Sequence, residues 1–201
     1  MTREEQRRLR DLKQALSSVE RTLAKSNGFQ YAHGYVFRFV GSFVYWLRCT
    51  ADLTHVRGTL AVKPTQLDEV LWDVLEMPEN RKQPKSFSVR GAFTAPFHVL
   101  PERLEVEMGG DLEAAYAELL SLVEPVIERY DGVLKSVGDF MGLIEHIPGQ
   151  KLNFILGEVF LGHEQHALEL LRDALSRQET GGFGGTRGSV YDYAVAYLEQ
   201  R

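Results

Sequence analysis

The 201-residue chain has a single cysteine, Cys49, and no long apolar segment. One cysteine excludes an internal disulfide bond and is typical of proteins from a reducing compartment. A membrane-spanning helix needs about 18 or more consecutive apolar residues, and no such run is present. The first residues, MTREEQRRLRDLKQ, are charged throughout and lack the apolar segment of a secretion signal. The sequence therefore predicts a soluble cytoplasmic protein.

Recognisable catalytic motifs are also missing. The chain has no G-x-S-x-G motif, which marks one large class of serine nucleophiles. Cys49 lies in an apolar strand pattern, where a buried structural thiol is the usual finding. No cofactor-binding motif was found, so no cofactor is expected. An enzyme is therefore less favoured than a binding protein.

The glycine-rich segment TGGFGGTRGSV is the nearest approach to a phosphate-binding loop. It follows a predicted helix rather than a buried strand, and it lacks the Lys-Ser/Thr ending of a P-loop. Gly181 or Gly182 is expected to end the preceding helix in a left-handed conformation. Ser189 and Asp192 form a predicted capping box for the last helix. Arg187 remains the candidate for an anion contact near that helix start.

Charge is unevenly distributed along the chain, whose formal net charge is −5. Up to Glu107 there are 16 Lys/Arg against 13 Asp/Glu, and from Met108 onward there are 7 against 15. An acidic half disfavours binding to a nucleic-acid backbone and suits a basic protein partner. We therefore expect a protein partner rather than nucleic acid or membrane.

The N-terminal half predicts a helix followed by an antiparallel sheet. Apolar residues recur every three or four positions within 3–25, which is typical of a helix lying on a sheet. YVFRFV and FVYWLRC flank Gly41 and Ser42, so they predict a hairpin with a two-residue turn. VRGTLAVK, FSVRGAF and RLEVEM are further strand candidates. The expected sheet has about five strands.

The register of this hairpin argues against an RNA-binding platform. Arg38, Arg48 and Trp46 would form a basic and aromatic surface only if they shared one face of the sheet. A two-residue turn places Arg38 on one face and both Arg48 and Trp46 on the other. Both faces are mainly apolar, so we expect the sheet to be covered at least partly on each side.

The rest of the chain predicts helices. PTQLDEVLWDVLEM is a short helix, with Thr65 and Asp68 as a capping box. The pattern becomes helical from Asp111, and Pro125 is expected to kink or split the first long helix. Residues 151–177 form a further helical region.

These patterns together predict one α+β domain over residues 1–201. An antiparallel sheet flanked by helices is expected in 1–107, and a helical C-terminal section in 108–201.

The segment GHEQHALE contains the best candidates for metal ligands. His163, His166 and Glu169 are spaced by three residues each, so a helix places them within reach of one side. Zinc or iron accepts such ligands, especially if Glu145 and His146 approach from a neighbouring helix. The spacing differs from the H-E-x-x-H motif of zinc hydrolases. A metal-dependent enzyme is therefore an alternative, beside a solvated surface.

An acidic row on the short helix is the candidate surface for a partner. Glu69, Asp73 and Glu76 lie opposite its apolar stripe, and Trp72 lies beside them. Tryptophan is a frequent anchor of protein interfaces. The alternative is a solvated acidic face with the tryptophan packed at the edge of the core.

The order of elements over residues 9–75 resembles small uncharacterised bacterial α+β proteins, some of which are similar to immunity proteins. These begin with an amphipathic helix followed by a GF…F strand. The residues that carry the resemblance are Gly28, Phe29, Phe37, Lys63, Pro64, Asp68 and Trp72. It implies a non-catalytic protein that binds and neutralises a partner.

The leading hypothesis is thus an immunity-type inhibitor of a basic protein. A homo-oligomeric structural component, associating through the stripe from Leu9 to Leu23, is a further alternative.

Overall fold

The computed structural model describes residues 2–201, and its contacts group them into two compact units. Unit 1 comprises residues 2–62 and Val99–Val133, and unit 2 comprises Lys63–His98 and Leu134–Arg201. Each unit is built from two separate stretches of the chain. This grouping differs from the expected division after residue 107, because the first helix of the C-terminal half belongs to unit 1.

The charge asymmetry along the chain disappears in the folded units. Unit 1 carries 12 Lys/Arg against 14 Asp/Glu, a net charge of −2, and unit 2 carries 11 against 14, a net charge of −3. The basic N-terminal helix and the acidic helix after residue 111 are both in unit 1. The strongly acidic half predicted as a partner-attracting region is therefore not one body in the structure.

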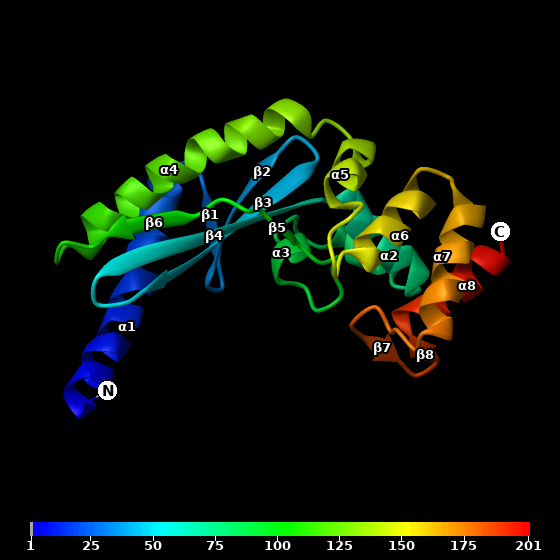
Figure 1. Ribbon diagram of the computed structural model, residues 1–201, viewed down its shortest axis with the longest axis horizontal. Coiled ribbons are helices and arrows are strands. Elements are labelled where there is room, and N and C mark those ends of the chain that lie inside the picture. Colours follow the sequence, from blue (N-terminus) through cyan, green and yellow to red (C-terminus); the bar gives the residue numbers. More distant parts are fainter. Residues whose placement is uncertain (1) are drawn as a thin grey trace. The chain divides into compact units, whose positions relative to one another are not determined.

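Unit 1 holds most of an antiparallel sheet (Figure 1). The strands follow the order β1-β2-β3-β4-β5, and β6 pairs with β4. Their bounds are β1 Gln30–Ala32, β2 Tyr35–Val40, β3 Phe43–Ala51, β4 His55–Pro64, β5 His98–Val99 and β6 Leu104–Glu107. The predicted α+β class, with an antiparallel sheet of about five strands, is confirmed.

The predicted hairpin is confirmed residue by residue. Val40 pairs with Phe43 and Phe37 pairs with Trp46, so the turn consists of two residues. Its first residue, Gly41, has a φ of 57°, a conformation that glycine adopts without a steric penalty. The register places alternate residues of β3 on opposite faces, as the sequence predicted. Tyr45 and Leu47 are buried on one face and Val44 on the other.

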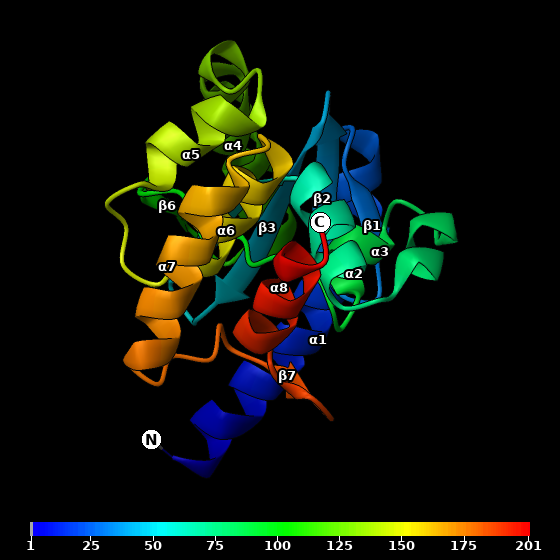
Figure 2. The same ribbon diagram turned by 90° about the vertical axis from the view of Figure 1, so that its right-hand side faces the viewer.

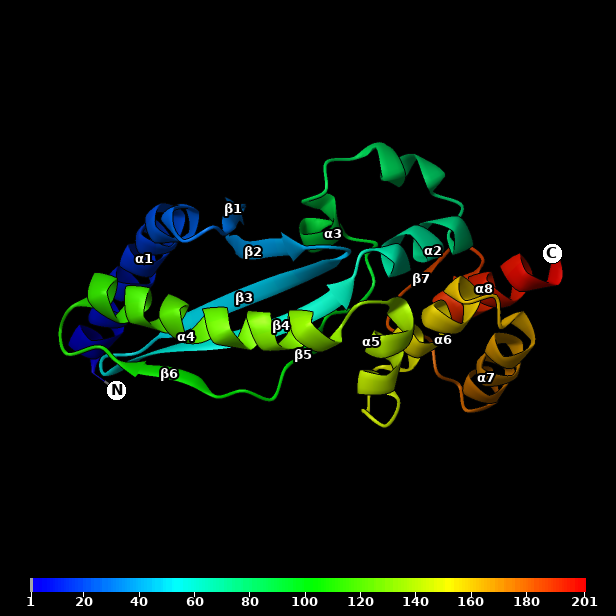
Figure 3. The same cartoon turned by 90° about the horizontal axis from the view of Figure 1, so that it is seen from above.

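Two long helices, α1 (Arg3–Ser26) and α4 (Leu112–Val133), complete unit 1. They pack against each other, α1 also contacts β1 and β3, and α4 also contacts β6. Figure 3 shows α4 running along the sheet. The expected helix on a sheet is thus confirmed for α1. Of the kink or split expected at Pro125, the split is wrong, since α4 continues through it to Val133.

Unit 2 is mainly helical (Figure 2). Helix α2 packs on α6 and α8, α7 packs on the same two helices, and α5 packs on α6. The helices are α2 Gln66–Val74, the 3-10 helix η1 Pro78–Lys82, α3 Phe87–Arg90, α5 Val137–Ile144, α6 Lys151–Phe160, α7 Glu164–Ser176 and α8 Val190–Glu199. No helix within residues 2–201 is long and apolar enough to cross a membrane.

Two local predictions in unit 2 are wrong. FSVRGAF forms the one-turn helix α3 rather than a strand, with the Val89 and Arg90 amides bonded to the Ser86 carbonyl. Thr65 and Asp68 do not form a capping box for α2, because Thr65 has a helical backbone and the Asp68 carboxylate binds Lys63. The predicted helical region 151–177 is confirmed as two helices, interrupted at Gly162, whose φ is 79°.

The glycine-rich segment is a small hairpin, β7 (Gly184–Gly185) and β8 (Gly188–Ser189), that leads into α8. Ser189 and Asp192 form the predicted capping box. Helix α7 ends at Ser176, and Gln178 is the left-handed residue next to its end. Gly181 and Gly182 also have a positive φ, at 71° and 96°, but they lie beyond the helix end and do not terminate it. Helix α8 buries Val190, Tyr191, Ala194 and Leu198, so it is part of the core of unit 2.

Candidate functional site

Two histidines and one glutamate meet where α6 leads into α7. Nδ1 of His166 lies 2.6 Å from Oε2 of Glu158, and Nδ1 of His163 lies 3.4 Å from the same oxygen. The glutamate is buried, whereas both imidazoles are about half exposed. The break at Gly162 turns α7 back beside α6, which brings the three side chains together. The structure thus brings His163 and His166, two of the three predicted ligands, to the buried carboxylate of Glu158, which was not predicted.

Glu169, the third predicted metal ligand, is not part of this group. Its Oε1 accepts a hydrogen bond of 3.2 Å from Nε2 of Gln165 on the exposed side of α7. Glu145 and His146 face each other at 3.9 Å and are exposed. Across residues 2–201, no group of three or more His, Cys, Asp or Glu side chains is arranged to hold a metal ion.

Trp72, predicted as an exposed anchor, is buried in unit 2. The residue is only 5% exposed, and its indole N–H donates a 2.6 Å hydrogen bond to the Phe93 carbonyl. The ring also packs on Phe87 at a centroid distance of 5.9 Å. Burial of the ring contradicts its role as a partner anchor, since a partner cannot reach it.

The acidic row beside Trp72 is largely paired within unit 2. Asp73 forms an ion pair of 2.5 Å with Arg81. Glu76 forms one of 2.5 Å with Arg187, whose guanidinium also lies 4.8 Å from the Tyr193 ring centroid. The predicted anion of Arg187 is therefore a carboxylate of the same chain. Glu69 is the member of the row that keeps an exposed carboxylate without an ion pair among the described residues.

A buried ion pair joins the end of β4 to α2. Lys63 Nζ donates a 2.7 Å hydrogen bond to Oδ1 of Asp68, and both side chains have no solvent exposure. Lys63 also donates to the Ala95 carbonyl, and the Ala95 amide donates to Asp68. Burial lowers the pKa of Lys63 and raises that of Asp68, while their mutual attraction opposes both shifts. This pair is sealed from solvent and fixes the segment around Ala95, so it is structural.

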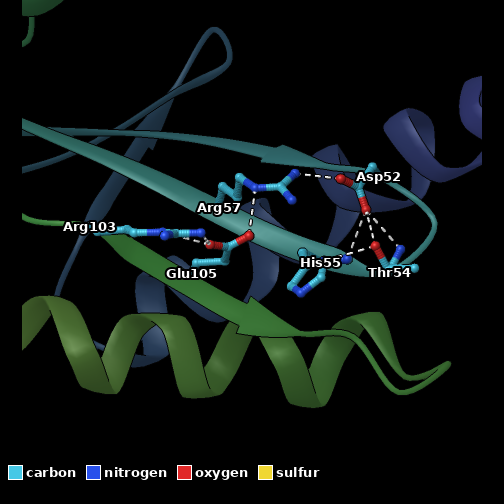
Figure 4. Close-up of polar contacts among 6 residues, drawn as sticks. All are labelled: Asp52, Thr54, His55, Arg57, Arg103 and Glu105. Carbon is cyan, nitrogen blue, oxygen red and sulfur yellow. Dashed lines mark hydrogen bonds and ion pairs between the residues drawn. The ribbon is translucent and has the colours of Figure 1, made fainter.

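Unit 1 carries an exposed chain of charges along β4 and β6 (Figure 4). Arg57 and Glu105 are paired opposite each other, and Nε of Arg57 lies 2.8 Å from Oε1 of Glu105. Arg57 also pairs with Asp52, and Arg103 pairs with Glu105. The four side chains neutralise one another in pairs. Arg57 and Glu105, on neighbouring strands, are an ordinary cross-strand charge pair.

Asp52 closes the turn between β3 and β4 in the same cluster. Its Oδ1 accepts hydrogen bonds from the amides of Thr54 and His55, at 2.8 and 2.9 Å, and from the Thr54 hydroxyl at 2.8 Å. The Arg57 guanidinium and these donors hold the pKa of the carboxyl well below its usual range. Asp52 is thus a permanently charged turn residue and is poorly suited to act as a general base.

A hollow of unit 2 lies between the end of α5, the loop that follows it, α6 and α7. We call it the α5–α7 hollow. Its volume is about 490 Å³, within the usual range of ligand pockets. Ile144, Ile147, Phe154 and Leu170 supply apolar walls, and Glu145, His146, Lys151 and His166 supply polar groups.

The positive charge of Lys151 in the lining of this hollow is paired with two carboxylates of the chain. Lys151 is 2.8 Å from a carboxylate oxygen of Glu179 and 3.8 Å from one of Asp173. Ile147 is 42% exposed at this hollow.

The sequence did not indicate this surface, because its apolar residues come from α5, the loop after it, α6 and α7, and none of them stands out from its local pattern.

Comparison of the chain with protein-family models, with curated proteins and with solved structures gives no match. The site is therefore interpreted from its own geometry.

Proposed function

We propose that this protein acts by binding a partner protein through the α5–α7 hollow, without catalysing a reaction. The observation that carries the proposal is the exposed Ile147 at the edge of a hollow of about 490 Å³. Apolar side chains exposed around a concave surface with a polar rim are typical of protein interaction sites. The hollow offers room for an apolar anchor side chain of a partner.

Charge supports a basic partner. Unit 2 has a net charge of −3, and the Lys151 ammonium is already balanced by Glu179 and Asp173. Glu145 is in the lining of the hollow. Within residues 2–201 its one ion-pair partner is the neighbouring His146, at 3.9 Å. A partner whose apolar anchor is flanked by lysine or arginine would be complementary here. An immunity-type inhibitor is the specific form of this proposal, and it rests on the resemblance of residues 9–75.

A photo-reactive amino acid in place of Ile147 tests the proposal directly. We expect a cross-linked product of defined mass in an extract of the native host, and we expect unlabelled wild-type protein to suppress it. The same amino acid in place of Leu122, an apolar residue of unit 1 that is 39% exposed, is the matched control. Equal labelling from both positions, or none from Ile147, would contradict the proposal.

The captured partner then allows a test of its charge. Glu145→Lys should slow association, and the rate for the wild type should fall as salt is raised, because steering between opposite charges is screened. Glu118→Lys, an exposed change of the same charge on α4 of unit 1, is the control. An association rate that does not respond to salt would exclude the basic partner while leaving the hollow as the binding surface.

A further inference from the structure

A hollow of about 380 Å³ in unit 1 has a carboxyl group in its wall. Glu20 of α1 contributes the carboxyl, and the remaining lining comes from the turn before β2 and from β3. We call it the Glu20 hollow. Its other lining residues are Gly34, Tyr35, Trp46, Leu47, Arg48 and Cys49.

Helix α1 holds Glu20 on its buried side. Leu16 and Ala24, one helical turn before and after it, are also buried, and Glu20 itself is only 9% exposed. The Glu20 carboxyl has no hydrogen bond or ion pair with any other residue in 2–201. Burial therefore raises its pKa from 4.5 to about 7. A largely buried carboxyl without a partner in the chain, in the wall of an open hollow, is a candidate to pair with a cationic group that enters it.

The titratable groups of unit 1 that interact electrostatically with Glu20 do not compensate its charge. They are the Cys49 thiol of β3 and the Tyr116 hydroxyl of α4, which is fully buried. Burial raises the pKa of both groups, so the thiol and the hydroxyl stay neutral near pH 7. Cys49 is consequently a poor nucleophile, and chemistry on the thiol is not favoured.

Two arginines close to the Glu20 carboxyl do not neutralise it. Arg21 follows Glu20 in α1 but is exposed, with its guanidinium 5.6 Å from the Tyr31 ring centroid. Arg48 is in the lining of the hollow and is exposed. Neither arginine forms an ion pair with Glu20 within residues 2–201.

We propose that the Glu20 hollow binds a small organic monoammonium ligand, whose ammonium group pairs with the Glu20 carboxylate. An ammonium supplies the N–H donors and the positive charge that the carboxylate lacks. Tyr35 and Trp46, with ring centroids 6.2 Å apart, line the same hollow and offer aromatic surface to the ligand's carbon chain. The positive charge of Arg48 in the lining disfavours a second cationic group, so a monoamine should bind better than a diamine.

The test uses n-butylamine as the probe and 1-butanol as its neutral counterpart of the same shape. The carbon-13 signal of the Glu20 carboxyl is followed by NMR in the full-length protein. We expect saturable binding of n-butylamine with a dissociation constant on the order of 1 mM, and a fall in the Glu20 pKa on binding. Butanol should not produce the shift. Putrescine, the matching diamine, should bind more weakly than n-butylamine.

Glu20→Gln should weaken binding of n-butylamine at least about tenfold and should fold, since it removes a buried charge. Asp11→Asn, which neutralises an exposed carboxyl of the same helix, should leave binding unchanged. Equal binding of butanol and butylamine, binding that survives Glu20→Gln, or no saturable shift of the Glu20 carboxyl signal would overturn the proposal. The NMR titration of the wild type decides the question even if the variant fails to fold.

Discussion

Two buried carboxyl groups, Asp68 in unit 2 and Glu20 in unit 1, have opposite surroundings. In unit 2, Asp68 accepts hydrogen bonds from the Lys63 ammonium and the Ala95 amide. In unit 1, Glu20 meets a thiol and a hydroxyl, and it has no ion pair within residues 2–201. A buried charge held by an opposite charge and a backbone donor favours one arrangement of the chain, whereas a buried charge without such partners lowers stability. The contrast separates a structural carboxylate from a candidate binding group.

Removing the Asp68 carboxylate should have the largest effect. Asp68→Ala leaves the Lys63 ammonium buried without a counter-charge, so we expect the free energy of unfolding to fall by about 3–5 kcal/mol. Urea denaturation measures this loss. The double variant Lys63→Met with Asp68→Leu should recover most of it, because no charge is then left in the interior. A loss in the double variant as large as in the single one would show that the charges themselves matter little.

The same denaturation curves test the predicted single domain over residues 1–201. One domain predicts one transition, and Asp68→Ala should shift it as a whole. Two transitions, of which only one moves, would show that units 1 and 2 unfold independently.

Neutralising Glu20 should have the opposite sign and a smaller size. The folded-state pKa of Glu20 is about 7 and its ordinary value is 4.5, so the folded protein favours the protonated form. Glu20→Gln should therefore stabilise the protein at pH 8 by about 2 kcal/mol, after allowance for screening by the solvent that still reaches the group. Thermal or urea denaturation at pH 8 measures the gain, and Asp11→Asn is the control. A loss of stability would contradict the buried, unpaired state of Glu20.

The pH dependence of the wild type sharpens this prediction. Below pH 4.5 Glu20 is protonated in both the folded and the unfolded protein, so its burial carries no charge penalty there. Between pH 4.5 and about 7 the unfolded state loses the proton first, and the contribution of Glu20 to stability declines through that range. The difference in unfolding free energy between wild type and Glu20→Gln should follow this curve, growing from near zero at pH 4 to its full value at pH 8.

The exposed charges of unit 1 should give the smallest effect. Glu105→Gln removes the carboxylate that pairs with Arg57 and Arg103 at the sheet edge (Figure 4). Exposed ion pairs are solvated and screened, so we expect the urea midpoint to change less than it does for either Glu20 or Asp68. Repeating the measurement in high salt should reduce even that change. An effect comparable to that of Asp68→Ala would mean that this chain of charges is essential to the sheet.

Local patterns in the sequence predicted those parts of the fold that depend on local forces. The turn at Gly41 and Ser42 determined the register of β2 and β3, and alternation along the strands determined their faces. The Ser189 and Asp192 capping box followed from hydrogen bonds three residues apart. These features need no knowledge of distant residues, because the groups that form them are neighbours in the chain.

Predictions failed where a distant residue competed for a local group. Asp68 was expected to cap α2, but Lys63 and the Ala95 amide bind it instead. Trp72 was a candidate partner anchor, with packing at the edge of the core as the alternative, and the Phe93 carbonyl and the Phe87 ring hold it inside. Arg187 was a candidate to bind an external anion, but its guanidinium pairs with the carboxylate of Glu76, which is far away in the sequence of the same chain.

The Glu20 hollow was missed although a signal for it exists. Leu16, Glu20 and Ala24 are spaced by four residues, which places the glutamate between two apolar residues on one helical face. Attention to polar residues inside an apolar stripe would have identified it. The partners Cys49 and Tyr116 could not be found in this way, because they come from β3 and α4 and meet Glu20 only in the folded unit.

The glycines of the β7–β8 hairpin have a consequence for how such sequences evolve. A β-carbon at Gly181 would overlap Cγ1 of Val190, and one at Gly188 would lie 2.6 Å from Oδ2 of Asp192. Both positions also have a positive φ, at 71° and 123°. Close packing against the first turn of α8 is therefore enough to preserve these glycines through natural selection. Relatives of this chain should retain them whatever they bind, so an invariant glycine pattern here would record the docking of the last helix and carry no information about a ligand.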